Sequence, residues 1–226
     1  MNVLRNVSFY QVLKLLLMGS IASILLTLTL SSIFPVDSWF GYVGTGIVEE
    51  AGKVLAVALL MGRRRYNWIL NGMLFGAAVG AGFAAFESAG YILGAGLSSD
   101  AAMIQEIIVR AILAPGGHVV WCAITSAALW KVRGNNNFSF EMLKTPQFIR
   151  AFCFVAALHA IWDIDAIRIP FLGDCGIIGK MLLLTVVAWL VALGYIQAGL
   201  RQVRQAQQVT PTPENEAPSA AKSVSA

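Results

Sequence analysis

Charged residues are scarce in this chain of 226 residues. Only 12% of the residues are Asp, Glu, Lys or Arg, whereas 58% are hydrophobic. A soluble domain carries about twice this charged fraction, at roughly 25%. The hydrophobic residues form long blocks, and these blocks lack the alternation of membrane-barrel strands. The composition therefore excludes an ordinary soluble domain and predicts an all-α bundle of membrane-spanning helices.

Cysteines are also few, and the basic residues are not clustered into one patch. The three cysteines, at positions 122, 153 and 175, have no CxxC spacing, which excludes a disulfide framework and a zinc knuckle. The net charge of +4 is distributed over the short segments between hydrophobic blocks. Membrane proteins show this distribution because cytoplasmic loops are rich in Lys and Arg. We therefore expect the lipid bilayer as surroundings and no nucleic-acid partner.

Six hydrophobic blocks are long enough to cross a hydrocarbon core of about 30 Å; they cover residues 10–34, 40–61, 67–94, 106–130, 148–167 and 175–199. Basic residues flank them mainly on one side, at Arg5, Arg63, Arg64, Arg65, Lys131, Arg133, Lys144, Arg201 and Arg204. The opposite segments contain Asp37, Asp100 and the region 163–174. This asymmetry places both termini in the cytoplasm. The expected location is the cell membrane, as a multi-pass protein of the bacterial cytoplasmic membrane.

The C-terminal residues differ in composition from the rest of the chain. From residue 205 onward they are rich in Pro, Ser, Ala and Glu, which is typical of disordered segments. We therefore expect one membrane domain over residues 1–204 and a disordered tail over residues 205–226. The sequence predicts no particular oligomeric state.

Ionisable residues nevertheless occur inside four of the six blocks. Such residues cost several kcal/mol in a membrane and usually face a partner or a cavity. Counted at 1.5 Å of rise per residue, Glu49, Glu87 and His159 each lie roughly 12–13 Å from the outer end of their block, and His118 about 18 Å. Helices that run in alternating directions thus bring these residues to one level in the outer half of the bilayer. We expect a shared polar site there, formed by Glu49, Glu50, Glu87, His118 and His159.

Residues near these positions fit such a site. Lys53 projects between Glu49 and Glu50 on a helix, so it can pair with either carboxylate. Phe83, Glu87 and Tyr91 share one helix face, and Asp163 lies one turn after His159, where it can orient the imidazole. Pro115, Gly116 and Gly117 precede His118 and weaken the helix at that point.

Several of these residues also have a purely structural interpretation. Lys53 and Arg110 are best explained as counter-ions of the glutamates, while Phe83 and Tyr91 are more often packing residues than site residues. Lys180, near the end of a block, is expected to extend to the membrane surface. The four-residue spacing within two runs of glycines, first Gly72, Gly76 and Gly80 and then Gly90 and Gly94, indicates close helix packing.

Two kinds of chemistry are open to the polar site. A desolvated glutamate can take a proton from water while histidines stabilise the developing oxyanion. Alternatively, Glu and His side chains can hold a zinc ion whose bound water is the nucleophile. Both routes lead to hydrolysis inside the membrane. No H-E-x-x-H, G-x-S-x-G or P-loop motif occurs, so the familiar soluble hydrolases are excluded.

Four short motifs, taken in order, resemble the PrsW-type intramembrane proteases. They are Glu49-Glu50-x-x-Lys53, Phe83-x-x-x-Glu87-x-x-x-Tyr91, His118 in the next span, and Leu158-His159-Ala160-x-Trp162-Asp163. They cover residues 40–165. The wider group of this family includes the CAAX prenyl proteases and bacteriocin-processing or immunity proteins.

The resemblance implies an intramembrane endopeptidase that cleaves a membrane-bound protein, such as an anti-sigma-factor-like regulator, near the outer membrane face. Glu49 and Glu50 would be the base and its partner, and His118 and His159 would stabilise the transition state. Glu87 stands where the CAAX enzymes have a histidine. The metal-free, glutamate-dependent route is favoured, with no cofactor; the alternative is a zinc ion held by Glu87, His118 and His159.

Two other functions are weighed against the peptidase. A non-catalytic scaffold or immunity protein of the same superfamily is expected to lack one or more of the Glu and His residues, and all are present here. A proton-coupled transporter could use Glu and His as a relay, but it is expected to have paired halves with interrupted helices. Only one break, at Pro115, is found.

Overall fold

The computed structural model describes residues 7–63, 65–169, 173 and 175–209. Among these residues the secondary structure is helical, without strands. The predictions made for Arg5, Arg64, Asp174 and residues 210–226 lie outside them, as does the side chain of Asp37. The three cysteines are free, and Cys122 is buried.

Twelve short and long helical segments follow one another along the described chain; they are α1 (Phe9–Lys14), η2 (Leu15–Gly19), α2 (Ser20–Ile33), α3 (Val36–Phe40), α4 (Tyr42–Met61), α5 (Ile69–Gly96), α6 (Asp100–Leu113), η3 (Ala114–Gly116), α7 (His118–Arg133), η4 (Phe140–Lys144), α8 (Pro146–Asp163) and α9 (Gly176–Val209). The all-α prediction is confirmed. The helix α9 extends past the predicted domain boundary at residue 204, and the disorder of the remaining tail stays a prediction.

Four helical stretches are long and apolar enough to cross a membrane: Phe9–Ile33, Ile69–Gly96, Asp100–Arg133 and Gly176–Gln208. They correspond to four of the six predicted spans. The predicted span 40–61 corresponds to α4, which contains Glu49, Glu50 and Lys53. The predicted span 148–167 corresponds to α8, which contains Arg150 and Asp163. These charged residues lower the apolar character of both helices, so the count of six spans stays a prediction. Exposed leucines such as Leu28 and Leu190 fit contact with lipid.

The predicted break in the fourth span is confirmed. The α-helix stops at Leu113, continues as a 3₁₀ turn that contains Pro115, and resumes at His118 after Gly117. Proline lacks the N–H group needed for helix continuation and its ring clashes with the preceding turn. The break leaves His118 as the first residue of α7, at the helix N-terminus.

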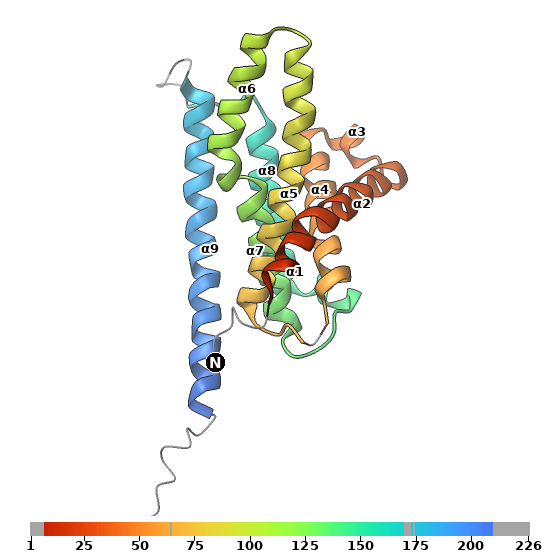
Figure 1. Ribbon diagram of the computed structural model, residues 1–226, viewed down its shortest axis with the longest axis vertical. Coiled ribbons are helices and arrows are strands. Elements are labelled where there is room, and N and C mark those ends of the chain that lie inside the picture. Colours follow the sequence, from red (N-terminus) through yellow and green to blue (C-terminus); the bar gives the residue numbers. More distant parts are fainter. Residues whose placement is uncertain (1–6, 64, 170–172, 174, 210–226) are drawn as a thin grey trace, which may run out of the picture.

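Helices α5 and α7 form the centre of the bundle and pack along their length (Figure 1). On one side α4 packs against α2, α5 and α8; on the other α9 packs against α7, α5 and α8. Helix α2 crosses the bundle obliquely, and the α5–α6 hairpin rises at the end opposite to loops 62–68 and 134–145 (Figure 1). The apolar core lies between these helices, around Phe75, Trp130 and Trp121.

Glycines allow the close approach of α5 and α7, but only along part of α5. A Cβ atom added to Gly76 would lie 2.2 Å from the Cys122 carbonyl oxygen, and one added to Gly80 would lie 2.2 Å from the His118 carbonyl oxygen. Gly72 abuts the Trp130 side chain in the same way. For Gly90 and Gly94 nothing lies within 4 Å, so the packing role predicted for these two is wrong. Their part of α5 lies beyond the N-terminus of α7, which begins only at His118.

Candidate active site

Small residues on α4 bring the two glutamates against α8. A Cβ atom added to Gly46 would lie 3.1 Å from the Ala156 carbonyl oxygen and 3.3 Å from the His159 Cβ atom. Because any larger side chain would separate the helices, Gly46 fixes the distance between α4 and α8. One turn further along α4, Glu50 Oε1 therefore lies 3.0 Å from His159 Nδ1.

Lys53 lies at the centre of the polar cluster. Its Nζ atom is 2.6 Å from Glu50 Oε1 and 3.7 Å from Glu49 Oε2, and its side chain is fully buried. The same Nζ atom lies 4.3 Å from the centre of the Phe83 ring. The counter-ion role of Lys53 is thus visible in the structure, and Phe83, which is also buried, supports the ammonium group through a cation–π contact.

Lys53 also contacts His118, and this contact defines the state of the imidazole. Lys53 Nζ lies 2.8 Å from His118 Nδ1. Since an ammonium group can only donate hydrogen bonds, Nδ1 must accept and therefore carries no proton. The other ring nitrogen, Nε2, lies 2.8 Å from Glu87 Oε2 and donates to that carboxylate. His118 is thereby held between Lys53 and Glu87 as one tautomer.

Glu87 is held by a second cation. Arg110 Nη1 lies 3.2 Å from Glu87 Oε2, and Arg110 Nε lies 2.7 Å from Glu106 Oε1. The Tyr91 ring, 56% exposed, stacks on the Arg110 guanidinium at 3.8 Å. Arg110 therefore acts as the predicted counter-ion, and Tyr91 belongs to the rim of the site rather than to its centre.

His159 joins both glutamates to Asp163. While its Nδ1 atom faces Glu50, its Nε2 atom lies 3.4 Å from Asp163 Oδ2 and 3.7 Å from Glu49 Oε2. Only 2% of the His159 side chain is exposed. The Asp163 contact has the one-turn spacing that the sequence suggested. An imidazole with carboxylates at both nitrogens is favoured as a hydrogen-bond donor.

The two neighbouring glutamates have different surroundings. Glu50 is fully buried and its Oε1 atom contacts Lys53 and His159. Glu49 retains 16% exposure, and its buried Oε2 atom has no hydrogen-bond partner among the described residues. A buried carboxylate oxygen without such a partner costs free energy unless a ligand or water fills that place. The buried Glu50 Oε2 atom likewise has no hydrogen-bond partner among the described residues. Glu49 differs from Glu50 because it combines this free hydrogen-bonding capacity with partial exposure, whereas Glu50 is fully enclosed.

A cavity of about 560 Å³ opens onto the cluster. Glu87, His118 and Asp163 line it, together with Tyr42 at the start of α4 and Met181 near the start of α9. The first residues of α4 and α9 and the last residues of α8 meet at one end of the bundle, opposite to loops 62–68 and 134–145 (Figure 1). The cavity therefore connects the polar cluster with that end.

Trp121 is a site residue that sequence reasoning missed. Its ring lies 4.7 Å from the His159 ring and 5.3 Å from the His118 ring, measured between centroids. Its Nε1 atom is buried and has no hydrogen-bond partner among the described residues. The available signal was its position three residues after His118, which places both on one helix face.

One group of three ligand atoms is compatible with a metal ion. Glu49, His118 and His159 each offer an atom within 4.8 Å of the others. The alternative set predicted from the sequence contains Glu87 instead of Glu49, and which residues would hold a metal stays a prediction. Glu87 comes from α5 and lies on the far side of His118, bound to its Nε2 atom and to Arg110.

Lys180 supports the end of α8 from inside the protein. It is only 4% exposed, and its Nζ atom donates to the carbonyl oxygens of Trp162 and Ile164 at 2.8 and 2.9 Å. The expectation that Lys180 extends to the membrane surface is therefore wrong. Carbonyl groups at a helix C-terminus have no partner within the helix, and a cation satisfies them.

The apolar helices and the buried Glu–His–Lys cluster define a membrane protein with a polar centre. The chain belongs to the PrsW family: the family model described as PrsW family intramembrane metalloprotease matches residues 8–194. No curated relative and no solved structure is found to match. Membership in this family supports a peptidase whose substrates are membrane proteins.

Proposed function

We propose that this protein is an intramembrane endopeptidase in which Glu49 activates a water molecule for attack on a peptide bond. The observation that carries the proposal is the Glu49 Oε2 atom, which lacks a hydrogen-bond partner among the described residues and belongs to the glutamate of the pair that retains exposure. It lies 3.7 Å from both Lys53 Nζ and His159 Nε2. A water molecule at this carboxylate would be next to donors that can hold it, and the carboxylate would receive its proton.

The other residues have supporting roles in this proposal. His159 donates from Nε2 toward the developing oxyanion, while Glu50 holds its Nδ1 side in place. Lys53 keeps Glu50 ionised and fixes His118, and His118 with Glu87 forms the wall on which the substrate carbonyl is placed. Helix α7 starts at His118, so the partial positive charge of its N-terminus also favours negative charge in the cavity.

A metal-dependent reaction is the alternative, and the residues fit it in part. Glu49, His118 and His159 supply one oxygen and two nitrogens, a common zinc-ligand set. A zinc ion held by these three would supply an ionised water as nucleophile. Against this, the Lys53 ammonium occupies the Nδ1 lone pair of His118 at 2.8 Å and would repel a divalent cation. We therefore favour the metal-free route.

The proposed substrate is a membrane-bound regulatory protein, cleaved near the outer membrane face. The cavity opens at the end opposite to loops 62–68 and 134–145, and the basic residues concentrate at the loop end. By the charge rule that end is cytoplasmic, with both termini. The cavity then opens toward the outer face, in the bacterial cytoplasmic membrane.

The proposal is tested with purified protein reconstituted in liposomes together with single-span reporter proteins. Products are identified by mass spectrometry after reaction in ¹⁸O-labelled water, which marks the new carboxylate. We expect cleavage by the wild type and by Glu141→Gln, an exposed control, and none by His159→Ala. Unlabelled products, or equal cleavage by His159→Ala, would exclude the mechanism. A scaffold or a transporter would give no cleavage with any variant.

A further inference from the structure

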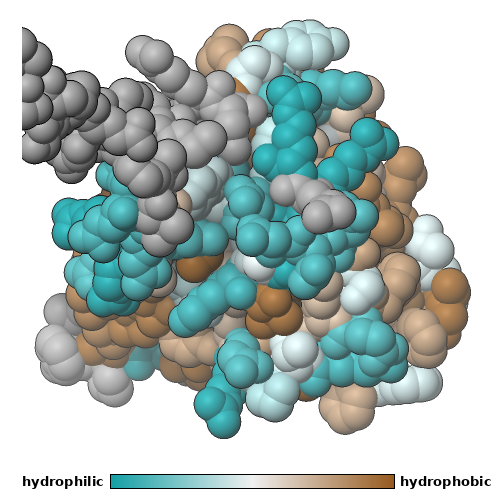
Figure 2. Space-filling model, turned by 90° about the horizontal axis from the view of Figure 1, so that it is seen from below, coloured by the Kyte–Doolittle hydropathy of each residue, from teal (hydrophilic) through white to brown (hydrophobic). Residues whose placement is uncertain are grey.

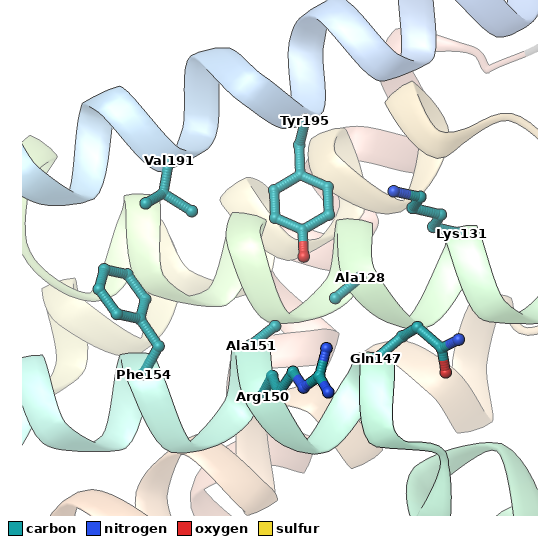
Figure 3. Close-up of a pocket in the computed structure, with 8 residues that line it drawn as sticks. All are labelled: Ala128, Lys131, Gln147, Arg150, Ala151, Phe154, Val191 and Tyr195. Atoms are coloured by element: carbon teal, nitrogen blue, oxygen red, sulfur yellow. The ribbon is translucent and has the colours of Figure 1, made fainter.

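A second cavity, of about 350 Å³, lies between α7, α8 and α9, away from the polar cluster (Figure 3). Lys131, Gln147 and Arg150 line it toward one end, and Phe154 and Val191 line it toward the other (Figure 3). The cavity thus has a polar, cationic end and an apolar end. This is the arrangement that an amphiphilic ligand requires.

The cations at the polar end are unpaired within the described protein. Lys131 and Arg150 are exposed, and neither forms a side-chain ion pair or hydrogen bond with a described residue. No acidic side chain lines the cavity. The Tyr195 hydroxyl points into the same space (Figure 3). Two cations and a hydroxyl group that converge without an anion favour a phosphate group as their partner.

The position of the cavity in the bundle corresponds to the membrane surface. Arg150 lies one turn inside α8, which begins at Pro146, and Lys131 lies two residues before the end of α7. Hydrophilic side chains gather on this end of the molecule, between hydrophobic ones, in the view from below (Figure 2). Phe154 lies one turn further into α8 and so deeper in the bilayer. The cationic end is therefore at headgroup level and the apolar end at acyl-chain level.

Helix α9 forms the third wall of this cavity, and it is longer than is needed to cross the bilayer. Its 34 residues correspond to about 51 Å, compared with a hydrocarbon core of about 30 Å. It continues past the ends of α7 and α8 (Figure 1). Tyr195 then falls at the interface, where tyrosine is enriched in membrane proteins.

We propose that this cavity binds one anionic phospholipid. Lys131 and Arg150 hold the phosphate, Tyr195 donates a hydrogen bond to it, and an acyl chain lies along Phe154 and Val191. Basic pockets between membrane helices on the cytoplasmic side bind anionic headgroups in this way. Ala128 and Ala151, both nearly buried, leave the room that the lipid occupies.

The test is a lipid titration of the full-length protein in detergent, followed by native mass spectrometry. The probes are dioleoyl phosphatidylglycerol, dioleoyl phosphatidylcholine and water-soluble glycerol phosphate. We expect the wild type to bind the anionic lipid at least tenfold more tightly than the zwitterionic lipid. In Lys131→Gln/Arg150→Gln this affinity falls about 30-fold, since each cation contributes about 1 kcal/mol.

Two controls separate a built site from general surface charge. Arg201→Gln/Arg204→Gln removes two exposed cations of α9 and is expected to change the affinity less than threefold. Ala151→Phe fills the cavity with both cations kept and is expected to abolish selective binding, with the melting temperature measured alongside. Three results would overturn the proposal. They are an equal loss of lipid affinity in the two charge variants, unchanged lipid binding by Ala151→Phe, and displacement of the lipid by glycerol phosphate at the same concentration.

Discussion

Lys53 and Glu50 form an ion pair that is completely buried: the Nζ and Oε1 atoms are 2.6 Å apart, and neither side chain is exposed. The two residues lie one turn apart in the middle of α4, a helix whose other charged residue is Glu49. Each charge is tolerated in the interior because the other is present. This pair holds both histidines, since Lys53 contacts His118 and Glu50 contacts His159.

Removal of one partner of this pair is predicted to destabilise the protein strongly. In Lys53→Met the Glu50 carboxylate is left without its cation, at a cost of about 3–5 kcal/mol. In Lys53→Met/Glu50→Gln most of this stability returns, because the fully buried Glu50 charge is removed together with its cation, and the remaining Glu49 is partly exposed. The free energy of unfolding in detergent measures both effects. Equal destabilisation by the single and the double variant would contradict the assigned coupling.

Two glycines of α5 provide a matched comparison. Gly80→Ala places a Cβ atom 2.2 Å from the His118 carbonyl oxygen, whereas Gly94→Ala meets nothing within 4 Å. We expect Gly80→Ala to lower stability by about 1–3 kcal/mol through overpacking. Gly94→Ala is expected to be neutral, or stabilising by up to about 1 kcal/mol, because alanine favours the helix. Thermal unfolding of the two variants decides this, and equal effects would mean that α5 and α7 are packed differently.

Lys180 is predicted to be a structural residue of the site, acting through the end of α8. Lys180→Met removes the donor for the carbonyl oxygens of Trp162 and Ile164, at a cost of about 1–3 kcal/mol. Lys144→Met, at an exposed ion pair, serves as the control and is expected to change stability by less than about 1 kcal/mol. Amide hydrogen exchange near Asp163 should increase only in the first variant. Unchanged exchange there would refute the role.

Chelation of divalent metals is predicted to leave cleavage unchanged, because the Lys53 ammonium holds one of the three candidate ligands. The measurement is the cleavage rate of reconstituted protein before and after treatment with 1,10-phenanthroline. Loss of activity with recovery on addition of zinc would instead favour the set Glu49, His118 and His159 as a metal centre.

The sequence predicted which residues form the site better than it predicted how each of them is oriented and which partner it contacts. Ionisable residues inside apolar blocks are costly, so their presence together with their equal depth indicated that Glu49, Glu87, His118 and His159 meet. The structure brings them into one cluster. Helix depth follows from counting residues, but helix rotation depends on packing. Spacing alone therefore did not show which of the two glutamates is fully buried; in the structure it is Glu50. It also did not show that Glu49 lies with the two histidines in the metal-compatible group.

Residues with more than one favourable environment were the least predictable. Lys180 could reach either the membrane surface or the carbonyl groups of α8, and only the proximity of α8 decides between them. Gly90 and Gly94 repeat the four-residue spacing of Gly76 and Gly80, but α7 begins too late to cover them. The break at Pro115 was predictable because proline acts on the local backbone and needs no partner.

The most direct test of the proposed mechanism is the cleavage rate of Glu49→Gln, measured together with its melting temperature. The substitution removes the base but keeps the size of the side chain and leaves the Lys53–Glu50 pair intact. We predict a rate at least 100-fold below that of the wild type, the lower end of general-base contributions, with an unchanged melting temperature. A rate within threefold of the wild type would contradict the assignment of Glu49 as the residue that activates water.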